Sequence, residues 1–134
     1  MTMLGNNRGY IQLARYIVSL SWIYHGFFPK LYHIAPLEKL MTGSAAFSAE
    51  VSDLITRSAG VGEIIFGLCL FVFYKNKHLV ILNILALIGL LLAVVAMQPQ
   101  LLIEAFNPVT TNLPLIGLSV IWLKEIKLLN NRYL

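Results

Sequence analysis

Glu63 is the only charged residue in the apolar stretch SAGVGEIIFGLCLFVFY, residues 58–74. A charged side chain at the centre of a bilayer costs about 2.5–3.5 kcal/mol, so it must be protonated, partnered or hydrated. Gly60, Glu63 and Gly67 share one face of a helix because they are three and four residues apart. Glycines on that face let a neighbouring backbone approach closely. We therefore predict that Glu63 points into a helix interface and handles a proton or a ligand.

Two further polar side chains, His25 and Asn112, are predicted at a similar depth. Counting about 1.5 Å per residue from the flanking basic residues places Glu63 and Asn112 each about 18 Å into the membrane, and His25 about 15 Å. A carboxyl and an imidazole in contact would titrate as a coupled pair, and could pass a proton or bind a polar head group. The structural alternative is that Glu63 bonds to neighbouring helices, His25 to a backbone carbonyl, and Asn112 serves helix packing.

Trp22 and Lys30 complete the predicted site. Trp22 shares a helix face with His25, and Lys30 lies toward the outer end of the same segment. The alternative for Trp22 is packing, and for Lys30 a position at the water boundary beside an anionic head group. No metal is predicted, because one histidine and one glutamate do not supply the usual three or four ligands. Cys69 is the only cysteine, which excludes dithiol exchange within this chain.

The elements that position these residues are predicted to be membrane-spanning helices. Of the 134 residues, 58% are hydrophobic and 12% charged, whereas soluble domains average about 45–50% and about 25%. A helix needs about 20 residues to cross a bilayer, so four crossings would use most of the chain. The predicted spans are residues 16–34, 59–74, 79–97 and 107–123. We expect an all-α, integral membrane four-helix bundle that forms a single domain.

The basic residues indicate orientation. They form short groups beside the apolar segments, so the net charge of +4 does not predict nucleic acid as a partner. Seven flank one side of the predicted spans, namely Arg8, Arg15, Lys75, Lys77, Lys124, Lys127 and Arg132. Three flank the other side, namely Lys30, Lys39 and Arg57. This asymmetry predicts that both termini are cytoplasmic. The first segment could imitate a signal peptide, but we expect it to be a retained anchor.

The long outer connection, residues 35–57, is predicted to contain the start of the second helix. Ser48 is a suitable N-cap, and Glu50 lies near the positive end of the helix. Asp53 and Arg57 have the stabilising i,i+4 spacing. The second helix should therefore begin near residue 49 and protrude from the membrane.

Smaller irregularities are also expected. Gly26 and Pro29 together permit a kink in the first segment. Pro114 removes a helical hydrogen bond in the fourth and could interrupt it. The short connection between the second and third segments, 59–74 and 79–97, predicts that these two helices pack side by side.

Three stretches resemble the DoxX-like family of small membrane proteins. They are RYIVSLSWIYHGFFPKLY in the first segment, SAGVGEIIFGLCLF in the second and NPVTTNLPLIGLSVI in the fourth, within residues 15–124. The resemblance implies a four-helix membrane bundle, in a bacterium in the cytoplasmic membrane. The wider family is similar to subunits linked with quinone-coupled sulfur oxidation and with membrane oxidoreductase complexes. Animal relatives look like assembly chaperones for membrane receptors, so the resemblance does not fix one activity.

Residues and resemblance together predict an accessory subunit of a membrane oxidoreductase complex. It would bind a small amphipathic ligand, a quinone or a lipid, in an outward-facing pocket; whether it catalyses a reaction stays open. The alternative is an assembly protein, either a membrane chaperone or a complex subunit, whose Gly60 and Gly67 face packs against another membrane protein or a second copy. A proton-linked transporter is a third option, although four short spans without a repeat provide little machinery for alternating access.

Overall fold

The computed structural model describes residues 3–131, and this part of the chain is helical without strands. The α-helices are α1 (Met3–Phe27), α2 (Pro36–Gly43), α3 (Ala49–Val72), α4 (Lys77–Met97) and α5 (Pro108–Asn131). A π-helical turn, η1 (Phe28–Tyr32), follows α1, and a 3-10 helix, η2 (Pro99–Ile103), links α4 to α5. The predicted all-α class is confirmed.

Two helices, α3 and α4, are long and apolar enough to cross a membrane, judged by length and composition. The first and fourth predicted spans fall mainly within α1 and α5, which contain 25 and 24 residues. Both helices extend beyond the predicted spans, since α1 begins at Met3 and α5 ends at Asn131. Four crossings with both termini cytoplasmic therefore stays a prediction.

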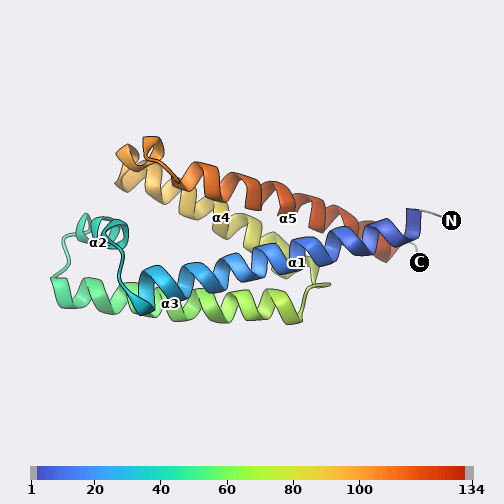
Figure 1. Ribbon diagram of the computed structural model, residues 1–134, viewed down its shortest axis with the longest axis horizontal. Helices are drawn as coiled ribbons and strands as arrows, with labels where there is room; N and C mark the ends of the chain where they lie inside the picture. Colours follow the sequence, from blue (N-terminus) through green and yellow to red (C-terminus); the bar gives the residue numbers. More distant parts are fainter. Residues whose placement is uncertain (1–2, 132–134) are drawn as a thin grey trace.

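The long helices pack as two pairs, and α1 connects the pairs (Figure 1). α3 packs along α1, α4 packs along α5, and α1 also packs against α5. Although a short turn joins α3 to α4, these two helices are not among the principal contacts of residues 3–131, so the prediction that they pack side by side was wrong. The chain termini and the α3–α4 turn lie at one end of the bundle, and α2 and η2 lie at the other (Figure 1).

Glycines explain why α3 packs against α1 instead. A Cβ atom added to Gly67 would lie 2.8 Å from both Ser19 O and Ile23 Cγ1, and one added to Gly60 would lie 2.6 Å from Gly26 O. These distances are too short for any larger residue. The Gly60 and Gly67 face is thus a helix interface, but the helix it meets belongs to the same chain. The alternative in which this face packs against another membrane protein therefore does not fit, because α1 already covers it.

The start of α3 follows its local sequence. The Ser48 hydroxyl accepts a hydrogen bond from Val51 N at 3.4 Å, and α3 begins at Ala49, as predicted. Arg57 does not pair with Asp53. Its Nη1 instead donates to Leu31 O at 3.3 Å, which connects α3 to η1.

The two prolines behave differently. At Pro29 the helix changes to π geometry, with His33 N donating to Phe28 O at 3.1 Å across five residues. The sequence indicated a kink at this place, because Gly26 and Pro29 lie close together. Pro114, in contrast, lies inside a continuous α5, so the expected interruption was wrong. A proline removes only one backbone donor, and Pro114 lies on an exposed face of α5.

Candidate ligand pocket

A cavity of about 350 Å³ is lined by residues of α1, η1, α2, α3, α4, η2 and α5. Its lining includes residues of η1, α2 and η2, and Figure 1 shows α2 and η2 at one end of the bundle. The five residues predicted to bind a ligand or handle a proton all line it: Trp22, His25, Lys30, Glu63 and Asn112. The structure therefore brings together side chains that the sequence placed at a similar depth. Their role in binding stays a prediction.

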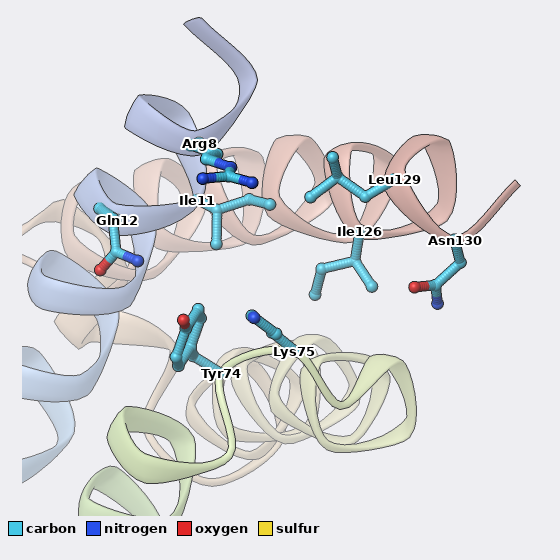
Figure 2. Close-up of a pocket in the computed structure, with 8 residues that line it drawn as sticks. All are labelled: Arg8, Ile11, Gln12, Tyr74, Lys75, Ile126, Leu129 and Asn130. Carbon is cyan, nitrogen blue, oxygen red and sulfur yellow. The ribbon is translucent and has the colours of Figure 1, made fainter. Parts of the chain in front are cut away.

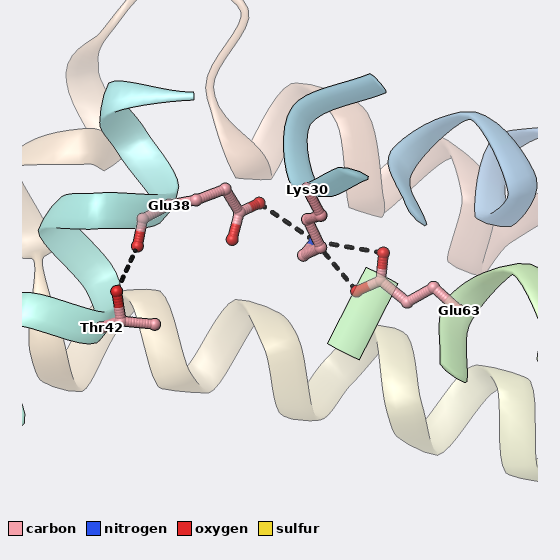
Figure 3. Close-up of polar contacts among 4 residues, drawn as sticks. All are labelled: Lys30, Glu38, Thr42 and Glu63. Carbon is pink, nitrogen blue, oxygen red and sulfur yellow. Dashed lines mark hydrogen bonds and ion pairs between the residues drawn. The ribbon is translucent and has the colours of Figure 1, made fainter. Parts of the chain in front are cut away.

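Lys30 is the centre of the charged groups in this cavity (Figure 3). Its Nζ lies 3.0 Å from Glu63 Oε1, 3.1 Å from Glu63 Oε2 and 3.0 Å from Glu38 Oε1. The three side chains are 11%, 13% and 21% exposed for Lys30, Glu63 and Glu38. Since Glu38 belongs to α2 and Glu63 to α3, Lys30 ties both helices to η1. We call these three residues the charged cluster.

The partner of Glu63 differs from the one expected. Its oxygens face Lys30, whereas a contact with His25 was considered at the sequence level. Lys30 was expected near water but is only 9% exposed as a residue. It lies in the π-helical turn, where the wider turn displaces side chains from their α-helical positions. Glu38 was missed. Its signal in the sequence is an acidic first turn in a short helix opened by Pro36.

His25 and Asn112 keep free hydrogen-bonding capacity. Both line the cavity, and neither side chain forms a hydrogen bond to protein within residues 3–131. The His25 ring lies edge-on to Tyr24, with 6.2 Å between ring centroids. An imidazole and an amide can each donate and accept, so these two groups can bind a polar atom of a ligand.

Trp22 is fixed by a second, uncharged network. Its Nε1 donates to Asn83 Oδ1 at 2.7 Å, and Asn83 Nδ2 donates to Ser119 Oγ at 2.7 Å. Asn83 and Ser119 are fully buried, and the Trp22 ring packs edge-on against Phe66 with centroids 5.0 Å apart. We call Trp22, Asn83 and Ser119 the neutral network. Asn83 was not predicted to matter, although it is the only polar residue of segment 79–97.

The remaining walls of the cavity are mainly apolar. They include Leu37, Met41, Leu87, Leu90, Val94 and Leu115. Small-molecule sites commonly combine apolar walls with a few polar groups that orient the ligand. Among the described residues there is no group of three histidine, cysteine or acidic side chains that could hold a metal ion. The arrangement thus suits an uncharged, amphipathic molecule whose polar end reaches His25 and Asn112.

These features define a helical protein with two apolar helices able to cross a membrane and a partly polar pocket among its helices. A sequence model of the DoxX-like family matches residues 19–120, well over half of the chain, and the chain belongs to this membrane-associated family. The family predicted from the sequence is therefore confirmed. Searches of curated proteins and of solved structures gave no match.

Proposed function

We propose that this chain is an accessory integral membrane protein that binds a small amphipathic ligand, a quinone or a lipid, in the cavity beside the charged cluster. In this proposal α1, α3, α4 and α5 all cross the cytoplasmic membrane of a bacterium, and both termini face the cytoplasm. The protein works with a membrane oxidoreductase complex. Family membership and the two apolar helices support the membrane setting.

The observation that carries the proposal is the pair of unbonded polar side chains, His25 and Asn112, in a cavity with apolar walls. Its volume of about 350 Å³ falls at the lower end of the roughly 300–1,000 Å³ typical of ligand pockets. The polar end of a quinone or a lipid carries carbonyl oxygens. Asn112 Nδ2 and an N–H of His25 are suitable donors to such an oxygen.

The charged cluster has a different part in this proposal. The ammonium of Lys30 has three N–H donors, and three carboxylate oxygens surround it at 3.0–3.1 Å. In this proposal the Lys30 ammonium is held by the two carboxylates rather than by a ligand, and Glu63 chiefly neutralises Lys30. The cluster holds η1, α2 and α3 in place around the cavity, while His25 and Asn112 contact the ligand. Trp22 offers its ring as a wall, because its N–H is already bonded to Asn83.

The two tryptophans provide a direct test. Trp22 lines the cavity, whereas Trp122 is fully buried elsewhere and donates to Tyr74 O at 3.0 Å. In a Trp122→Phe variant, the fluorescence of Trp22 should be quenched saturably by a short-chain ubiquinone added to protein in mild detergent. In the matched Trp22→Phe variant, Trp122 should show only weak, non-saturable quenching.

The binding groups are tested in the Trp122→Phe background. His25→Phe and Asn112→Leu should each weaken quinone binding about five- to ten-fold, as expected for the loss of one hydrogen bond. Unchanged affinity in both variants would refute the proposed pocket. Mass spectrometry of the gently solubilised protein provides a second readout. A copurifying quinone or lipid supports ligand binding, whereas a stoichiometric protein partner without such a ligand would favour the assembly role.

A further inference from the structure

A second cavity, of about 330 Å³, lies at the end of the bundle that carries the chain termini (Figure 2). It lies among the first part of α1, the last part of α5 and the α3–α4 turn. Its lining residues are Arg8, Ile11, Gln12, Tyr74, Lys75, Ile126, Leu129 and Asn130. None of them belongs to the first cavity.

The floor of this second cavity is apolar. Ile11 and Ile126 are 3% and 2% exposed and belong to the hydrophobic core, and Leu129 packs against the same core. A small, fully hydrated anion gains no binding free energy from contact with such an apolar surface. A molecule with hydrocarbon next to its polar group gains about 25 cal/mol for each Å² of apolar surface that it covers.

No acidic residue in the described part of the chain neutralises the positive charge at this cavity. Arg8 and Lys75 are both exposed, and neither forms an ion pair within the described part of the chain. Lys75 Nζ lies 5.5 Å from the centroid of the Tyr74 ring. Figure 2 shows Arg8 on α1 and Lys75 on the α3–α4 turn on opposite sides of the cavity. The lining contains no acidic residue, since Glu125, next to Ile126 in the chain, is not part of it. Lys30, by contrast, is paired with two carboxylates.

We propose that this cavity binds the phosphate headgroup of an anionic phospholipid. The phosphate lies between Arg8 and Lys75, the amides of Gln12 and Asn130 bond to glycerol or ester oxygens, and the apolar floor covers the first methylene groups. Basic pockets between helices at a membrane surface are suited to such headgroups. The proposal uses the membrane setting of the proposed function, but it is independent of any ligand in the first cavity.

Lipid competition measured by native mass spectrometry tests this site. Protein in mild detergent is mixed with equal amounts of phosphatidylglycerol and phosphatidylcholine that carry the same acyl chains. The wild type should retain phosphatidylglycerol about thirty-fold more than phosphatidylcholine, since two basic residues near the surface contribute about 1 kcal/mol each to the binding of anionic lipid. An Arg8→Gln/Lys75→Gln double variant should lose this preference.

A matched control has the same change in net charge. Lys124 and Lys127 are exposed on the same helix as Ile126 but do not line the cavity, so Lys124→Gln/Lys127→Gln should keep the preference. An equal loss in both double variants would attribute retention to overall charge and overturn the proposal. Quinone quenching of Trp22 should be unchanged in the Arg8→Gln/Lys75→Gln variant, so failure of this site and failure of the first cavity are distinguishable.

Two measurements on the wild type decide the question if the double variant does not fold. Retention of phosphatidylglycerol should fall as sodium chloride is raised, whereas that of phosphatidylcholine should not change, because exposed charges are screened by salt. Inorganic phosphate at millimolar concentration should not displace the lipid. Equal retention of the two lipids, or displacement by inorganic phosphate, would overturn the proposal.

Discussion

The neutral network and the charged cluster use polar side chains in opposite ways. Asn83 and Ser119 are fully buried, and the neutral network joins α1, α4 and α5 through uncharged hydrogen bonds. The charged cluster joins η1, α2 and α3, and its side chains keep some exposure where they line the cavity. The two networks thus stabilise different parts of the bundle.

The difference follows from the cost of burial. A neutral amide can be buried completely once its hydrogen bonds are made, whereas an ion pair must also compensate for the loss of hydration of two charges. The side chains of the charged cluster stay partly exposed at the cavity, which reduces that cost. The neutral network therefore fixes Trp22 without burying a charge, whereas the charged cluster lies where its side chains stay partly exposed at the cavity.

The largest effect is expected from Lys30→Met. It leaves two mainly buried carboxylates without their cation and should lower the free energy of unfolding by about 3–5 kcal/mol. Denaturant titration in detergent, followed by circular dichroism, measures this value. Lys39→Met is the control, because Lys39 is exposed and forms no ion pair in the described part of the chain. An equal effect of both substitutions would show that the charged cluster does not stabilise the fold.

An intermediate effect is expected from Asn83→Leu. The substitution leaves the Trp22 N–H without its acceptor and Ser119 Oγ without its donor, and should cost about 1–3 kcal/mol of the free energy of unfolding. Asn130→Leu is the control, since Asn130 is exposed. Adding Trp22→Phe to Asn83→Leu should cost less than the sum of the two single changes, because the shared hydrogen bond can be lost only once. Strict additivity would contradict a coupled network.

The smallest effect is expected from Glu38→Gln. Lys30 keeps both oxygens of Glu63, so global unfolding should change by only about 0.5–1.5 kcal/mol. Hydrogen exchange of residues 36–43 should rise, because α2 loses its ion pair to η1. Glu63→Gln should lower global stability more, since both oxygens of Glu63 contact Lys30. The reverse order would mean that α2, rather than α3, is the principal anchor of Lys30.

Much of the site followed from the sequence. Gly60 and Gly67 predicted a close helix interface beside Glu63, and counting along the helices placed Glu63, His25 and Asn112 at similar depths. The glycine interface is confirmed, because helical periodicity is regular over apolar segments, whereas the depth of the three polar residues in a membrane stays a prediction. All three residues line the first cavity.

The pairing of the side chains did not follow from the sequence. Lys30 turns toward Glu63 from a π-helical turn, a geometry that α-helical periodicity does not describe. The α1–α3 pairing depends on the fit of Gly67 against Ser19 and Ile23, which overrides the short connection between α3 and α4. The sequence indicates which faces are suited to contact, whereas the fit between helices selects the partner.

The pairing of helices has a consequence for biogenesis. α1 and α3 both precede α4 in the chain, so their glycine contact can form before the second half is synthesised. The α4–α5 pair can then dock onto α1, chiefly through α5. Because α3 and α4 are joined by a short turn with little contact between them, the protein should tolerate a break there. Two coexpressed fragments, residues 1–74 and 75–134, are expected to associate in the membrane and form the same bundle.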